Sequence, residues 1–94
     1  MVKHVVCFKI KEGESVEKAA EVLRSMKGNV PMLKDIEVGI DGLHSARSYD
    51  LMLTVLVDDF DALAAYQKDA YHCDVVKTHM HAVMAGSITV DYEM

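Results

Sequence analysis

The sequence predicts an α+β fold: a four-stranded antiparallel sheet with helices packed on one of its faces. Four segments alternate with period two and two regions have helical spacing, in the order strand, helix, strand, strand, helix, strand. The first and third strands are apolar on both faces, as strands in the middle of a sheet are. The 94 residues, 51% hydrophobic and 27% charged, are enough for one globular domain over residues 1–94.

The first half of the chain supplies two strands and a helix. Residues 3–11 alternate, and one face of this strand carries His4, Val6, Phe8 and Ile10. An amphipathic helix is expected from about residue 14 to residue 28, with an inward stripe of Val16, Ala19, Ala20, Leu23 and Met26. After Pro31, residues 35–41 form a strand with one polar face, which is typical of an edge strand.

The second half repeats this order with strands at 49–57 and 88–92. Asp58 or Asp59 can cap a helix, and a break at residues 69–70 separates it from a second helical stretch that ends at Gly86. The inward residues predicted for the two stretches are Phe60, Leu63, Ala64 and Gln67, then Val75, Val76, His79, Met80 and Val83. The whole order is the ferredoxin-like, split β-α-β arrangement, which places the first and third strands in the centre.

Helices on one face leave the other face of such a sheet uncovered. That face would carry Val5, Cys7, Met52, Thr54 and Leu56. A second copy of the chain could cover it, and burying about 600 to 800 Å² per protomer would reach the size of a stable interface. We therefore expect a homodimer that forms a dimeric α/β barrel, with a monomer as the alternative.

Composition excludes several classes of function. The net charge of −5 argues against binding to nucleic acid, and no apolar stretch is long enough for a membrane span. Cys7 and Cys73 are not part of a Cys-x-x-Cys pair and are expected to be free thiols. The sequence is thus typical of a cytoplasmic protein.

Several motifs together resemble the stress-responsive A/B barrel domain (Dabb) family. They are the opening strand Val2-Lys3-His4-Val5-Val6-Cys7-Phe8-Lys9, Val30-Pro31 followed by Val38-Gly39, Tyr49-Asp50-Leu51, Ala65-Tyr66-Gln67 ahead of His72, and Thr89-Val90-Asp91-Tyr92. The resemblance covers almost the whole chain and implies a dimeric α/β barrel. Many proteins of this family have no assigned activity.

The resemblance also implies a site. A plant polyketide cyclase of this family uses a histidine at the start of its third helix, a tyrosine six residues earlier and a histidine on its first strand, and these positions match His72, Tyr66 and His4. This chain departs from the family at residues 69–72, which lack the frequent His-Pro-x-His, and at Ala19, Ala20 and Leu23, where the cyclase has aromatic residues. A cavity of different shape, and a different substrate, would follow.

Removing a proton beside a carbonyl needs a base and a donor for the enolate oxygen. His72 could be the base and Tyr66 the donor, provided that the break at residues 69–70 folds His72 back toward Tyr66. Otherwise His72 is a solvated residue at a helix start and Tyr66 a core residue. His4 should be buried and need a hydrogen-bond partner, either as a core histidine or as a ligand contact.

The sequence is compatible with three functions. The first is a dimer that binds a small apolar or aromatic molecule between sheet and helices, in contact with His4, Phe8, Leu23 and Val55. The second is a cyclase or lyase without a cofactor, and the third is an assembly module with no cavity. The spacing of His79 and His81 does not suit a shared metal ion, so no metal or cofactor is expected.

Overall fold

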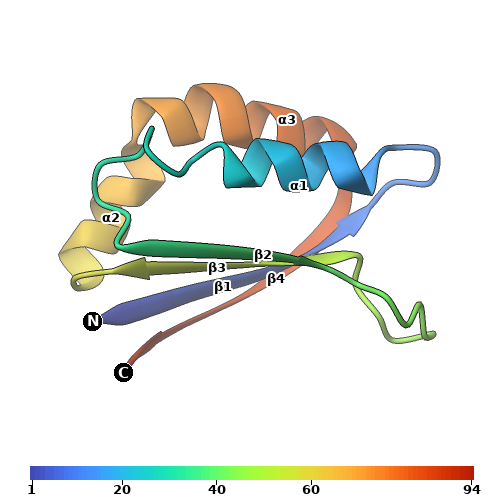
Figure 1. Cartoon of the computed structure of the whole chain (residues 1–94), viewed down its shortest axis with the longest axis horizontal. Coiled ribbons are helices and arrows are strands. Elements are labelled where there is room, and N and C mark those ends of the chain that lie inside the picture. The colour runs from blue at the N-terminus through green and yellow to red at the C-terminus, as the bar shows by residue number, and fades with distance from the viewer.

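The computed structural model describes residues 1–94 and has all its helices on one face of a four-stranded antiparallel sheet (Figure 1). The sheet order is β2-β3-β1-β4, so the first and third strands lie in the centre, as predicted. The α+β, ferredoxin-like fold is therefore confirmed. The strands are β1 (Val2–Ile10), β2 (Asp35–Ile40), β3 (Leu51–Val57) and β4 (Met84–Glu93).

Strand register decides which side chains face the helices. His4 pairs with Val55 of β3 on one side and with Asp91 of β4 on the other. Because paired residues point to the same face, the helix-facing side carries the even-numbered residues of β1, the odd-numbered residues of β3, and the odd-numbered residues of β4 from Ser87 onward. The inward face predicted for the first strand is confirmed by the burial of His4, Val6, Phe8 and Ile10.

The first two helices begin at capping side chains. Ser15 accepts a hydrogen bond from the backbone N–H of Lys18 at the start of α1 (Val16–Arg24), and Asp59 does the same for Ala62 at the start of α2 (Phe60–Lys68). The prediction that α2 turns Phe60 and Ala64 inward is wrong, because both are exposed. The buried stripe of α2 passes through Leu63 and Tyr66 instead.

The second helical stretch contains a π-helix that the sequence did not predict. After a break at Asp69, it consists mainly of η1 (His72–Lys77), which is π-helical, followed by α3 (Thr78–Val83). His72, Val76 and Met80 are spaced four residues apart on one face of this stretch, and all three are buried. Val75, predicted to face inward, is 42% exposed.

The last strand also begins earlier than predicted. The helical stretch ends at Val83, and β4 starts directly at Met84 rather than after Gly86. β4 therefore pairs with β1 along its whole length, with a shift of register between Lys9 and Ile10. This extension brings Ser87 and Thr89 opposite Phe8 and Val6, on the helix-facing side.

The core lies between the helices and the sheet, and no element covers the outer face of the sheet (Figure 1). Large apolar side chains are exposed on that outer face: Met52, Ile88, Val90 and Tyr92. All helices are too short or too polar to cross a membrane.

Candidate functional site

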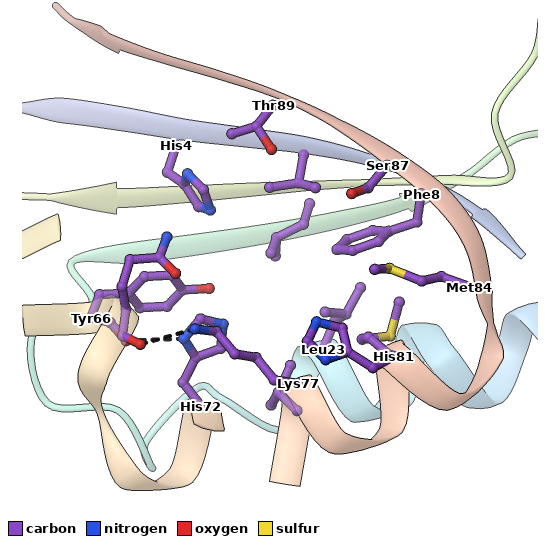
Figure 2. A pocket seen from close by; sticks show the side chains of 15 residues that line it. His4, Phe8, Leu23, Tyr66, His72, Lys77, His81, Met84, Ser87 and Thr89 are labelled. Carbon is purple, nitrogen blue, oxygen red and sulfur yellow. Dashed lines mark hydrogen bonds between the residues drawn. The ribbon is translucent and has the colours of Figure 1, made fainter. Parts of the chain in front are cut away.

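A cavity of about 180 Å³ lies between the helices and the sheet (Figure 2). An apolar cavity of about 150 Å³ is known to hold benzene, so this space suits one aromatic ring with a few further atoms. The strands contribute His4, Val6, Phe8, Leu53, Met84, Ser87 and Thr89 to its wall, and the helices contribute Leu23, Tyr66, Gln67, His72, Val76, Lys77, Met80 and His81. Eight of these fifteen residues are hydrophobic, and His81, Ser87 and Thr89 are exposed.

Most of the residues that sequence reasoning selected meet at this cavity. His4, Phe8, Leu23, Tyr66 and His72 all line it, although they come from four different elements. Val55 does not line it and is fully enclosed in the core. Leu53, two residues earlier on the same face of β3, takes its place in the wall.

His72 is folded back onto Tyr66 and is buried, 7% exposed, rather than solvated. The Asp69 carboxylate accepts a hydrogen bond from the backbone N–H of His72 at 3.0 Å. The His72 Nδ1–H donates to the backbone carbonyl oxygen of Tyr66 at 2.9 Å, and the two rings stack with centroids 4.1 Å apart. Because a carbonyl can only accept, the hydrogen sits on Nδ1 and the Nε2 lone pair of neutral His72 is free.

The surroundings of His72 favour its neutral form. Burial lowers the pKa of His72 below its usual value, and the nearby charges of Lys77 and His4 lower it further. The hydrogen bond to Tyr66 and the charge of Asp69 act in the opposite direction but do not outweigh burial. At neutral pH the ring is therefore a proton acceptor.

Tyr66 forms a wall of the site and keeps its proton. Its side chain is fully buried, and its hydroxyl donates to the sulfur of Met26 at 3.6 Å. Burial, together with the charge of Asp69, raises its pKa well above the usual range for tyrosine. The ring lies between His72 and His4, with the His4 centroid 5.6 Å away and edge-on.

His4 projects from β1 toward Tyr66 and His72 (Figure 2). Its Nδ1–H donates to the carboxylate of Asp91, the residue directly opposite on β4. Since a carboxylate only accepts, this contact fixes the hydrogen on Nδ1 and leaves Nε2 for other contacts. The sequence indicated that His4 needs a hydrogen-bond partner but did not identify Asp91 as that partner.

Five polar wall residues were not selected as site residues from the sequence: Gln67, Lys77, His81, Ser87 and Thr89. Ser87 and Thr89 share the alternation of Asp91, so the register of β4 with β1 was the missing signal. Lys77 comes to the wall through η1, and its ammonium donates to the backbone carbonyl of Gln67 at 3.0 Å. No three His, Cys, Asp or Glu side chains gather as a possible metal site.

Residues 2–94 match the stress responsive A/B barrel domain, Dabb. The chain belongs to the Dabb family. No protein of curated function matches it in sequence.

Solved structures share the fold of this Dabb chain at low sequence identity. A dimeric ferredoxin-like protein of unknown function from Thermobifida fusca YX is 22% identical with a TM-score of 0.85, over 99% of this chain and 90% of that one. An Arabidopsis thaliana protein is 21% identical with a TM-score of 0.84, over 100% and 95%. The hydroxynitrile lyase of Passiflora edulis is 13% identical with a TM-score of 0.80, over 99% and 92%. Dabb-like folds thus include enzymes and proteins without a known activity.

The cavity of this Dabb chain has space for a small molecule and two buried imidazole groups in its wall. His72 offers a neutral imidazole nitrogen, and His4 a second imidazole fixed by Asp91. Gln67 and Thr89 add groups able to bind an oxygen of the ligand. The site therefore has the components of acid-base chemistry on an oxygen-bearing apolar molecule.

Proposed function

We propose that this Dabb protein is a homodimer whose cavity binds a small apolar or aromatic carbonyl compound, and that His72 removes a proton from the carbon beside the carbonyl. One observation carries the proposal: the bond from His72 Nδ1–H to the Tyr66 carbonyl oxygen, 2.9 Å long, leaves Nε2 as a free base in the wall of the cavity. A neutral imidazole of this kind is a general base, and proton transfer by such a group contributes roughly 10²- to 10⁴-fold to a rate.

The enolate formed by this step needs a hydrogen-bond donor. Tyr66 keeps its phenolic proton, and the thioether sulfur of Met26, its present acceptor, is weak. An enolate oxygen would be a stronger acceptor, so Tyr66 can serve if its hydroxyl turns from Met26 to the ligand. No cofactor takes part in this step, because the proton moves to Nε2 and the charge to the oxygen.

The dimer rests on the uncovered outer face of the sheet. Val90 and Ile88 are 61% and 52% exposed there, and a contiguous apolar patch on a small protein commonly marks an interface. Similar structures from Thermobifida fusca, Bacteroides fragilis and Jannaschia are described as dimeric. We place the dimer in the cytoplasm, where the free thiols of Cys7 and Cys73 would stay reduced.

Binding without turnover is the second candidate function. The observation that favours it is the fully buried Tyr66, whose hydroxyl is already bonded to Met26. In that case the cavity would hold its ligand without a donor for an enolate. A pure assembly module is disfavoured because such a module would fill the space between helices and sheet.

Proton exchange tests the base without knowledge of the natural substrate. The probe is phenylacetone in D₂O, and NMR follows the loss of its protons beside the carbonyl. We expect the protein to accelerate this exchange over buffer, and His72→Gln to lower the acceleration at least tenfold while keeping a donor for the Tyr66 carbonyl. His44→Asn changes an exposed histidine in a distant turn and should exchange as the unmodified protein does.

Two results would contradict the proposal. Equal exchange by His72→Gln and the unmodified protein would reject His72 as the base. Binding of phenylacetone without any acceleration would leave the binding function in its place. Tyr66→Phe separates the donor role, since it should slow exchange without abolishing binding.

A further inference from the structure

The charged residues of the cavity wall are all basic or potentially basic. Lys77, His4, His72 and His81 line it, and no Asp or Glu does. The chain as a whole has the opposite balance, with fifteen acidic and ten basic residues. A concave site of one sign with apolar walls concentrates its field and attracts ligands of the opposite sign.

Two carboxylates lie near the cavity but behind its histidines. Asp69 accepts from the backbone N–H of His72, and Asp91 accepts from Nδ1 of His4. Neither belongs to the wall, and each has an oxygen engaged in these bonds. Asp91 holds the His4 ring and Asp69 the backbone of His72, and the wall itself has no anionic side chain.

Lys77 is the only lysine or arginine of the wall. It is half-buried on η1, and its ammonium makes one protein hydrogen bond, to the Gln67 carbonyl. An ammonium has three hydrogens to donate, so two remain for a ligand. The same cavity presents Phe8 and Leu23 from β1 and α1, which suits an aromatic or apolar body on the ligand.

We infer that the cavity selects a carboxylate: an aromatic or apolar oxo acid whose acid group pairs with Lys77 while its carbonyl faces His72. The carbonyl part of this inference rests on the proposed function, and the charge preference rests on the cavity wall alone. Lys77 is a binding residue in this scheme.

In this scheme, binding of a carboxylate also changes the basicity of His72. The positive charge of Lys77 opposes a proton on His72. A bound carboxylate would offset that charge and so make the His72 ring a stronger base at the moment when the substrate is present. The proton taken from the carbon goes to Nε2, and the electron pair of the broken C–H bond passes to the carbonyl oxygen.

Two probes of nearly equal shape test the charge preference. Benzoate and benzamide differ mainly in charge, and both fit the space for a single ring. Titrations followed by ¹H–¹⁵N NMR should show benzoate bound roughly tenfold more tightly than benzamide, the scale of a charge-assisted hydrogen bond in a partly screened site. Added salt should reduce this ratio.

Variants of Lys77 test whether this residue causes the preference for benzoate. Lys77→Gln should bring the benzoate to benzamide ratio close to one, and Lys77→Arg should restore it. Lys68→Gln is the matched control, because it removes the same charge from an exposed position outside the wall. If Lys77 only supported the fold, Lys77→Gln would weaken the binding of both probes equally and leave the ratio unchanged.

The inference fails if the unmodified protein binds benzoate and benzamide equally or binds neither. It also fails if Lys77→Gln has the same benzoate to benzamide ratio as the unmodified protein. It can fail separately from the proposed function, since phenylacetone is neutral. Exchange of phenylacetone without a preference for benzoate would overturn the carboxylate site alone. A preference for benzoate without exchange would overturn the base alone.

Discussion

At the scale of single residues, His72 is held in one tautomer by the backbone. Its Nδ1–H is used by the Tyr66 carbonyl, and its own backbone N–H by Asp69. Both partners come from the six residues that precede it, so the geometry is local and does not depend on the dimer. The ring is thereby fixed and desolvated, which is the state in which a histidine at neutral pH acts as a base.

The lowered pKa of His72 predicts how stability depends on pH. In the unfolded chain histidine titrates near its usual pKa of about 6.5, whereas burial holds the folded pKa of His72 below this. The unfolded chain therefore takes up the proton first as the pH falls. The contribution of His72 to stability is complete above about pH 6.5 and is lost progressively below it, until the folded pKa is passed.

Urea unfolding between pH 7.5 and 5 measures this effect. We expect the unfolding free energy of the unmodified protein to fall more steeply with acidification than that of His72→Gln, which has no proton to take up there. His44→Asn should keep the steeper dependence, because His44 is exposed. Identical slopes for the unmodified protein and His72→Gln would show that folding leaves the pKa of His72 unchanged.

The resemblance to the Dabb family implied that His4, Tyr66 and His72 meet at one cavity, and the sequence pattern was compatible with this. Strand alternation placed His4 inward, and the break at residues 69–70 allowed His72 to return to Tyr66. Lys77 could not be found in this way, because its position depends on the π-helical turns. Val55 was wrongly assigned to the cavity wall. A strand residue that faces the helices can lie in that wall or in the packed core, and strand alternation does not tell the two apart.

At the scale of elements, the start of the second helical stretch depends on Asp69. Its carboxylate accepts from the N–H three residues later, as the capping residue of a helix does. Asp69→Ala should lower the unfolding free energy by about 1 kcal/mol, the usual cost of losing a cap. It should also lower the pKa of His72 further, because the charge of Asp69 raises it.

Urea unfolding and an NMR titration of His72 check these two effects. Asp74→Ala is a suitable control, since Asp74 is an exposed acidic residue on η1 that takes part in none of the side-chain hydrogen bonds. If Asp69→Ala and Asp74→Ala were equally stable, the cap would contribute nothing.

The strands were easier to predict than the helices. A period of two is not changed by a shift of one or two residues at a strand end, so the faces of β1 and β3 were predicted correctly. A period of 3.6 was assumed for the last helical stretch, and η1 does not follow it. Val75 lies at the margin of the face predicted with that period and is 42% exposed.

At the scale of the whole molecule, the topology followed from the pattern but the partner did not. Apolarity on both faces of β1 and β3 required their central place, which the sheet order confirms. The same observation predicts a dimer through the outer face, and this stays a prediction. Hydrophobic patterning shows that a face needs a cover without showing which molecule provides it.

A single charge on the outer face tests the dimer. Val90→Lys places an ammonium on β4, next to Val5 of β1, and should convert a species of two chains into the 10.5 kDa monomer in sedimentation. Val75→Lys adds the same charge at an exposed apolar site on η1 and should leave the mass unchanged. A monomeric unmodified protein, or equal dissociation in both variants, would exclude an interface through this face.

The π-helical turns of η1 have a consequence for how such a protein could change over evolutionary time. Wide turns of this kind are equivalent to a residue inserted into an α-helix, and they often occur at functional sites. Losing one exposed residue between His72 and Lys77 would restore a regular helix and rotate one end of the segment by about 100° against the other. A related protein would therefore need the same number of residues in this segment, as well as the histidine and the lysine themselves, to keep both side chains on one cavity wall.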